Sequence, residues 1–324
     1  MLRHLPPLLA LLAAALLPAL GASPYVLGIG ITACIFTVGA ASLNLIYGYA
    51  GLLSFAHLAF WGIGGYCTAL GAVSLGIGFW GGLALAGLLN AALAVLVGIP
   101  ALRLNRHSFV IVTLSFSLLT ALVARDWVAV TGGPLGIPGL PAPELFGLSL
   151  RSPPRFYWLA LAFAALSLAL LRAVTTSRIG RTLKALRQNE PLAQAQGIAP
   201  TPYKLLAFAI SAALCGMAGG MQVFYMQVVD PLILDFYYFQ TFLVMMIVGG
   251  AGHFWAVVIA GIVMTVLPEL LRATAELRMV IYGALLLFAM VAMPGGVAGA
   301  LESWRDARRR ATAERPDPVT AAAS

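Results

Sequence analysis

The feature that most constrains the fold is a run of 99 residues, 4–102, that contains no Asp, Glu, Lys or Arg. A helix that crosses the hydrocarbon core of a bilayer needs about 20 predominantly apolar residues, so this run alone has room for about four spans. In the whole chain of 324 residues 61% are hydrophobic and 9% are charged, whereas an average soluble domain has about 25% charged residues. The sequence therefore predicts an integral membrane protein.

Further charge-free windows, separated by short polar segments, continue this pattern through the rest of the chain. Helices are expected rather than strands, because a lipid-exposed backbone must satisfy its own hydrogen bonds and the runs lack the alternating pattern of a membrane barrel. We predict an all-α polytopic fold with ten membrane helices, near residues 5–21, 25–47, 50–72, 79–101, 108–124, 156–173, 203–226, 238–252, 254–271 and 279–293.

The basic residues predict how these spans are oriented. Ten spans place both termini on one side, and 14 of the 19 Lys and Arg residues fall on that side. Since cytoplasmic loops carry the excess of Lys and Arg, both termini are expected to be cytoplasmic. Residues 1–22 have an alternative interpretation as a cleavable signal peptide, because Arg3 precedes an apolar run that ends in small residues. Cleavage would leave nine spans and the remaining topology unchanged.

Residues 1–301 are expected to form one transmembrane domain, followed by a disordered cytoplasmic tail at 302–324. An external loop at 125–155 contains Thr131-Gly-Gly-Pro-Leu-Gly-Ile-Pro-Gly139, and this density of Gly and Pro argues against regular helix. The loop has two possible interpretations, a simple connector or a docking or gating surface for an external partner.

The cytoplasmic segment 175–202 is more regular than a simple loop requires. Its basic residues recur every three positions, at Arg178, Arg181, Lys184 and Arg187, and the apolar residues Ile179, Leu183 and Leu186 lie between them. This pattern predicts a short amphipathic helix. A second short helix is expected to begin at Asn189-Glu190-Pro191 and to stop at Gly197. We favour a docking surface for a partner protein over adsorption to anionic lipid.

The residues that catalysis would require are missing. A phosphate-binding loop needs Gly-Lys-Ser/Thr, but Lys184 follows Leu183 and Lys204 follows Tyr203, so the chain is not expected to hydrolyse ATP itself. No metal-binding or hydrolase motif is present, and the three cysteines lie singly in apolar stretches. Although the net charge is +8, the basic residues fall between hydrophobic spans, which argues against a nucleic-acid partner.

Glycine placement points to a transport pathway, because glycines permit close helix approach or broken helices in a membrane. The most specific stretch is Gly48-Tyr-Ala-Gly-Leu-Leu-Ser-Phe-Ala-His57, which places helix-breaking glycines beside Ser54 and His57. Backbone amides freed there are expected to meet a polar solute. His57 itself is interpreted first as a packed, hydrogen-bonded residue and second as a solute or proton ligand.

Several motifs occur in the order typical of one permease family. The first combines Asn44-Leu-Ile-Tyr-Gly-Tyr-Ala-Gly51, Leu53-Ser-Phe-Ala-His57 and Phe60. The later ones are Val112-Thr-Leu114, Thr131-Gly-Gly-Pro134, Ser177-Arg-Ile-Gly-Arg181, Ala185-Leu-Arg187, Asn189-Glu190, Gly197-Ile198, Tyr203-Lys-Leu205, Ile247-Val-Gly-Gly250, Leu267-Pro-Glu-Leu-Leu-Arg272 and Tyr282-Gly283. Over roughly residues 25–297 the sequence thereby resembles the branched-chain amino acid ABC transporter permeases, of the LivM type.

This resemblance implies an ABC importer permease fold in a bacterial inner membrane, with broken or re-entrant segments. It also implies four partners, which are a second, LivH-like permease, two cytoplasmic ATPase subunits and a periplasmic substrate-binding protein. ATP and Mg²⁺ would bind to the ATPases, and no cofactor to this chain. The implied substrates are branched-chain or related amino acids, although the family also includes importers of urea, short amides and aromatic acids.

The resemblance assigns a coupling role to one set of residues, and the glycine pattern described above assigns the pathway to another. The ATPase-coupling segment would contain Arg178, Gly180, Arg181, Lys184, Ala185, Arg187, Asn189, Glu190 and Gly197. The candidate translocation pathway comprises Asn44, Gly48, Gly51, Ser54, His57, Phe60, Gly249, Gly250 and Gly252. The main alternative is an ion-coupled secondary transporter of a small polar solute, against which the scarcity of charge inside the spans argues. A non-transporting scaffold is a third possibility.

Overall fold

The computed structural model describes residues 21, 23–145, 148–270 and 295–299. Five helical stretches in these ranges are long and apolar enough to cross a membrane. They are α2 (Pro24–Asn44) with its π-helical continuation η2 (Leu45–Tyr49), α4 (Gly78–Ala101), α5 (Arg106–Asp126), α7 (Pro153–Thr176) and α10 (Pro200–Met226). Three more apolar helices are α3 (Ala56–Val73), α11 (Phe236–Gly249) and α12 (Phe254–Leu270). The predicted all-α polytopic fold is confirmed.

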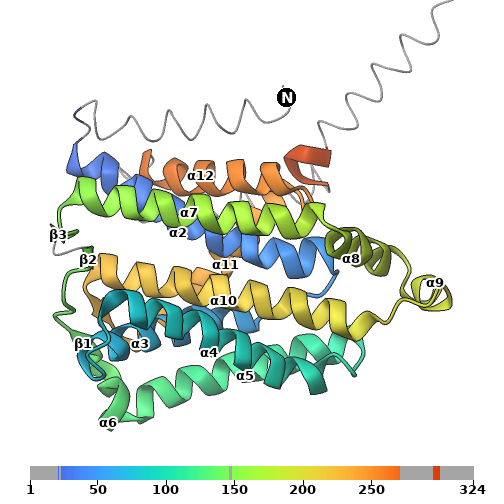
Figure 1. Cartoon of the computed structure of the whole chain (residues 1–324), viewed down its shortest axis with the longest axis horizontal. Helices are drawn as coiled ribbons and strands as arrows, with labels where there is room; N and C mark the ends of the chain where they lie inside the picture. Colours follow the sequence, from blue (N-terminus) through green and yellow to red (C-terminus); the bar gives the residue numbers. More distant parts are fainter. Residues whose placement is uncertain (1–20, 22, 146–147, 271–294, 300–324) are drawn as a thin grey trace, which may run out of the picture.

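The short elements gather at the two ends of the helix bundle (Figure 1). At one end, which we call the α8 end, lie α8 (Arg178–Gln188) and α9 (Glu190–Ala195). At the opposite end, the strand end, β1 (Ile137–Pro138) pairs antiparallel with β4 (Val228–Val229), and β2 (Glu144–Leu145) pairs with β3 (Leu148–Ser149). The remaining short elements are α6 (Val128–Thr131), η3 (Gly133–Leu135) and η4 (Pro231–Leu234).

Helix α10 lies in the middle of the bundle, against α2, α3 and α4. Small residues allow the close approach, because a Cβ built at Gly64 in α3 would overlap the Gly216 carbonyl of α10. A Cβ at Gly219 would likewise overlap the backbone of Trp61. Such packing of small residues is how helices associate in lipid, where apolar burial supplies no driving force. The close helix approach that glycines are expected to permit is thus observed between α3 and α10.

Most predicted spans agree with the observed helices to within a few residues, but the span predicted at 50–72 is wrong at its start. Residues 50–55 lie outside regular helix, and α3 begins at Ala56. Hydropathy does not reveal the break, because Leu52, Leu53 and Phe55 are as apolar as a helix core. The predicted spans 5–21 and 279–293 and the tail at 302–324 lie outside the described residues.

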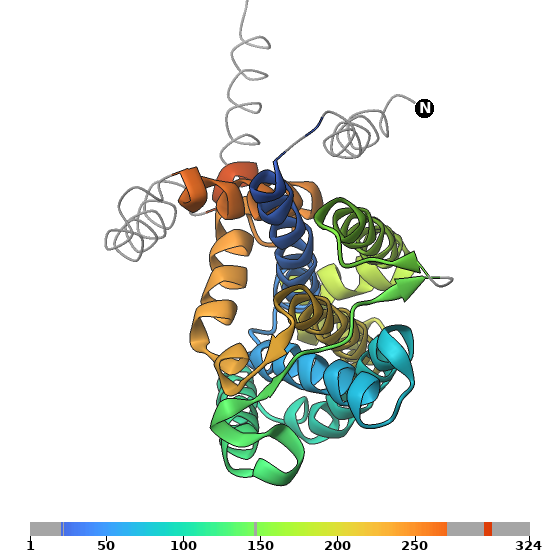
Figure 2. The ribbon, with the colours of Figure 1, turned by 90° about the vertical axis from the view of Figure 1, so that its left-hand side faces the viewer.

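Charged side chains occur at both ends of the bundle. Near the α8 end, Arg106 and Lys204 line a common cavity. At the strand end, Arg151 donates a hydrogen bond to Gln227 and Arg155 to the Ser149 carbonyl. Seen from the strand end in Figure 2, the chain between α5 and α7 passes across the end of the bundle. The predicted external loop at 125–155 therefore covers this face with short helical turns and strands instead of one long helix.

Candidate functional site

Helix α8 forms as its sequence pattern predicts. Ser177 caps its first turn, where the Ser177 hydroxyl accepts a hydrogen bond of 3.1 Å from the Ile179 amide. Gly180 allows the tight turn from α7, because a Cβ there would overlap the Thr175 carbonyl. Leu183 and Leu186 are buried, and the basic residues of α8, together with Ala185, stay exposed. The result is an amphipathic helix whose basic face is accessible.

Helix α9 also matches its prediction. Asn189 caps it, because its side-chain oxygen accepts a hydrogen bond of 3.0 Å from the Leu192 amide. The helix ends at Ala195, and Gly197 then takes a φ of 83°, a left-handed conformation that glycine adopts without strain. The connection between α8 and α10 is therefore two short helices with fixed ends.

Two basic residues of α8 turn toward the end of the first long helix. The guanidinium Nη1 of Arg187 donates a hydrogen bond to the Gly48 carbonyl in η2 and another, of 3.4 Å, to the Ala251 carbonyl. The ammonium of Lys184 lies 5.0 Å from the centre of the Tyr49 ring, a favourable cation–π distance. These contacts connect α8 directly to η2.

The point where α2 passes into η2 is attached to the turn between α11 and α12. The side-chain oxygen of Asn44 accepts a hydrogen bond of 2.8 Å from the Gly252 amide. Gly48 leaves the space for this bond, since a Cβ there would collide with both Asn44 and the Gly252 backbone. We call Asn44, Gly48, Arg187, Ala251 and Gly252 the Arg187 junction. It joins α8, η2 and the α11–α12 turn.

The turn at 249–252 depends on its glycines. Gly250 and Gly252 have φ values of 101° and 93°, where a side chain would be strained. Gly249 lies against α12, because a Cβ there would be 2.6 Å from the Cα of Val257. Nearby, the Arg172 guanidinium lies 5.5 Å from the Phe254 ring centre. Three of the predicted pathway glycines thus lie in a tight turn that the Arg187 junction contacts.

The segment 50–55 separates η2 from α3, and its amides do not match the prediction. The Gly51 amide donates to the Tyr47 carbonyl at 3.0 Å and the Leu52 amide to the Ile46 carbonyl at 3.1 Å. The expectation that freed amides here meet a solute is therefore wrong for these two groups, because the π-helical turn supplies carbonyl acceptors. Gly51 itself has a φ of 75°, and a Cβ there would lie 3.0 Å from Cγ of Arg187.

The far end of this segment is attached to α5. The Phe55 amide donates to the Thr113 hydroxyl at 3.2 Å, and the Ser117 hydroxyl donates to the Phe55 carbonyl at 2.8 Å. Ser54 is fully buried, and its hydroxyl has no hydrogen-bond partner among the described residues. Segment 50–55 therefore crosses between η2 and α5 with one unpaired hydroxyl in its interior.

His57 and Phe60 lie in the core of the bundle. The Nε2 atom of His57 is 2.6 Å from the Ser211 hydroxyl, which donates in turn to the Ser42 carbonyl. The Phe60 ring packs against the rings of Phe116 and Phe208, and both His57 and Phe60 are fully buried. This geometry agrees with the first interpretation of His57, that of a packed and hydrogen-bonded residue.

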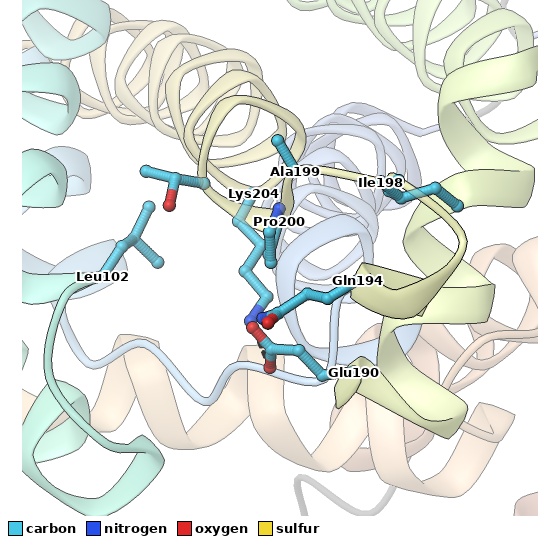
Figure 3. A pocket seen from close by; sticks show the side chains of 9 residues that line it. Leu102, Glu190, Gln194, Ile198, Ala199, Pro200 and Lys204 are labelled. Carbon is cyan, nitrogen blue, oxygen red and sulfur yellow. Dashed lines mark hydrogen bonds and ion pairs between the residues drawn. The ribbon is translucent and has the colours of Figure 1, made fainter. Parts of the chain in front are cut away.

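A polar groove of about 460 Å³ lies beside α9 (Figure 3). Within it the Lys204 ammonium of α10 forms an ion pair of 2.7 Å with Glu190 of α9, and Figure 3 shows Gln194 beside this pair. Lys204 is buried, with 8% of its surface exposed. Removing Glu190 would leave the buried Lys204 ammonium without its partner, so the pair holds α9 against α10.

The sequence analysis missed Tyr49 and Ala251, which contact Lys184 and Arg187. Each is next to a predicted glycine, Gly48 or Gly252, but only the three-dimensional structure shows which side of the turn faces α8. Arg106 is one of the basic residues that the sequence assigns to the cytoplasmic side, and its guanidinium lies 3.7 Å from the position of a Cβ on Gly51. Within the described ranges no group of three or more His, Cys, Asp or Glu side chains is arranged to hold a metal ion.

A bundle of long apolar helices with a broken segment and an accessible amphipathic helix at one end is the architecture expected of a multi-pass membrane permease. The chain belongs to the family described as branched-chain amino acid transport system / permease component, whose model matches residues 25–290. The resemblance to LivM-type permeases is thereby confirmed.

Relatives in enteric bacteria agree with this assignment. The chain is 33% identical to the high-affinity branched-chain amino acid transport system permease protein LivM of Salmonella typhimurium, over 81% of this chain and 67% of the relative. The LivM protein of Escherichia coli K12 shows the same identity and coverage. The LivH permease of Salmonella typhimurium is 25% identical over 80% of this chain and 90% of LivH. No solved structure matches the chain significantly.

Proposed function

We propose that the chain is the membrane-spanning permease subunit of an ABC importer that carries branched-chain or related amino acids across the inner membrane. ATP hydrolysis, with its Mg²⁺, occurs on two partner ATPase subunits. A LivH-like permease completes the membrane part, and a periplasmic binding protein delivers the solute. The relatives support the substrate class, because both LivM and LivH are named as components of branched-chain amino acid transport systems.

The observation that carries this proposal is the Arg187 junction. Helix α8 has an exposed basic face for a partner, and its Arg187 is hydrogen-bonded to both η2 and the α11–α12 turn. A displacement of α8 by an ATPase would therefore act on both elements at once. In this orientation the α8 end and both termini are cytoplasmic, in keeping with the excess of Lys and Arg at that end.

The charge distribution favours this proposal over an ion-coupled carrier acting alone. Among the described residues the buried members of the Asp, Glu, Lys, Arg and His group are His57 and Lys204. Lys204 is paired with Glu190 near the α8 end, and His57 is bonded to Ser211. Carriers that couple to ions usually place several ionisable groups inside the bundle.

Site-specific photo-crosslinking in the complete complex tests the proposal. A photoreactive residue at Arg178 or Arg181, on the exposed face of α8, is expected to form an adduct with an ATPase subunit. The photoreactive residue placed instead at Trp158 of α7, which is 47% exposed in an apolar span, is expected to form no ATPase adduct. ATPase adducts from Trp158 and none from α8 would contradict the proposed docking face.

A further inference from the structure

A second candidate site lies toward the strand end, on the side of segment 50–55 that faces α5. It is a cavity of about 380 Å³ between α5, η4 and the start of α11, and we call it the Arg125 cavity. Its lining includes the apolar side chains of Leu118, Leu122 and Phe236 and the two charged side chains of Arg125 and Asp235. Most solute sites have this composition, a largely apolar wall with a few charged groups that fix orientation.

We propose that the Arg125 cavity is the entry site of the transported solute and that it takes a zwitterionic amino acid with an apolar side chain. This inference rests on the importer function proposed above. It differs from the predicted pathway in that Asn44, Gly48 and Gly252 belong to the Arg187 junction at the other end of the molecule. The solute instead meets α5 and α11 first.

The charges of the cavity match the two charges of an amino acid. Arg125 lies in the last turn of α5, and its guanidinium has no ion pair or hydrogen bond among the described residues. A guanidinium presents parallel N–H donors that fit a carboxylate. Asp235 supplies a carboxylate for an ammonium group, and its Oδ1 also accepts a hydrogen bond of 2.8 Å from the Tyr237 amide, which fixes its position. Leu118 and Leu122, which are 64% and 56% exposed, form an open apolar wall against which a hydrocarbon side chain would lie.

Segment 50–55 relates the Arg125 cavity to a transport pathway. Phe55 lines the Arg125 cavity, and Leu52, three residues earlier, lines a separate cavity of about 120 Å³ near Glu190 and Lys204 at the α8 end. Residues 52–55 thus lie between two cavities that reach toward opposite ends of the molecule. This barrier contains the buried hydroxyl of Ser54, which has no partner among the described residues, and is continuous with Gly51, where an added Cβ would lie 3.0 Å from Cγ of Arg187. A shift of α8 therefore acts on the element that separates the two cavities.

The test is uptake of radiolabelled leucine into proteoliposomes that contain the complete complex, with binding protein outside. Arg125→Gln and Asp235→Asn each remove one charge, and Asn keeps the oxygen that caps α11. Each is expected to lower uptake about tenfold, the effect of one lost charge-assisted hydrogen bond. Arg125→Lys should retain part of the rate. ATP hydrolysis stimulated by the binding protein, and membrane abundance, should stay at the wild-type level.

Matched variants separate the cavity from general damage. Asp230→Asn is the control for Asp235→Asn. Like Asp235, Asp230 caps a helix through its Oδ1, in this case η4, but it does not line the cavity. Ala121→Trp fills the cavity and should block uptake, whereas Leu119→Trp, on the same helix and outside the lining, should not. Normal uptake by Arg125→Gln, Asp235→Asn and Ala121→Trp would overturn the inference and identify the cavity as a space for lipid. Absent uptake by the wild-type complex would instead contradict the importer function.

Discussion

The Arg187 guanidinium of α8 donates a hydrogen bond to the carbonyl of Gly48, a residue 139 positions earlier in the chain. The same nitrogen reaches the Ala251 carbonyl in the α11–α12 turn. One side chain thereby joins an amphipathic helix at the end of the bundle to two elements of the membrane core. A hydrogen bond from a charged donor is about twice as strong as a neutral one, so loss of Arg187 is expected to weaken the connection between α8 and η2.

We expect Arg187→Ala to uncouple the transporter without unfolding it. Loss of the bonds to Gly48 and Ala251 should lower ATP-driven leucine uptake about tenfold, while the variant is inserted at normal abundance. Gln188→Ala, at the exposed neighbouring position of α8, is the control and should transport normally. The measurement is uptake divided by ATP hydrolysed in the same vesicles. An unchanged ratio for Arg187→Ala would remove Arg187 from the coupling route.

Gly51→Val is expected to abolish uptake at normal membrane abundance. Gly51 has a φ of 75°, and a β-branched side chain there would also press on Arg187. Gly76→Val separates the backbone strain from the pressure on Arg187. Gly76 has a similar φ of 64°, but nothing lies within 4 Å of its Cβ position. The control should keep most of its transport. Near-normal uptake by Gly51→Val would show that segment 50–55 has no part in transport.

His57→Gln is expected to retain most uptake, with the same dependence on pH as the wild type. Gln can make the hydrogen bond that His57 makes to Ser211, but it cannot take up a proton. An ordinary histidine changes its protonation between about pH 6 and pH 8. Leucine uptake measured over this range therefore distinguishes a packing role of His57 from a role in proton or solute binding. Loss of uptake, or loss of a pH dependence that the wild type shows, would identify His57 as a proton or solute ligand.

Topology reporters test the orientation. A reporter fused after residue 190 or at the C-terminus should report a cytoplasmic position, and one near Gly139 a periplasmic position. The physical reason is the excess of Lys and Arg near the α8 end, which retains loops in the cytoplasm. A periplasmic position for residue 190 would reverse the molecule and contradict docking of α8 on a cytoplasmic ATPase.

The sequence predicts the long helices well because the bilayer requires about 20 apolar residues for each. It also predicts α8 and α9, since their basic and capping residues act locally at Ser177, Asn189 and Gly197. Segment 50–55 is different. Its apolar composition suits a helix, and only the positive φ of Gly51 and the contact of Phe55 with Thr113 show where the helix is broken.

Long-range contacts account for the rest of the site. Asn44 and Gly252 are 208 positions apart, and neither residue type specifies the other as a partner. In the sequence, Arg125 and Asp235 are only two charges that border charge-free windows. Their place in one cavity depends on how α11 packs beside α5, which hydropathy does not encode. The residues were thus visible in the sequence, but their grouping was not.

The most direct test of the central claim measures what drives transport. The chain is reconstituted into vesicles with its LivH-like partner, the two ATPases and the binding protein. Leucine uptake is measured with and without ATP on the side of the membrane that carries the ATPases. Each measurement is repeated with ionophores that abolish ion gradients. The account predicts uptake that requires ATP hydrolysis and continues when proton and sodium gradients are dissipated. Uptake by this chain without the ATPases, driven by an ion gradient and stopped by the ionophores, would contradict it.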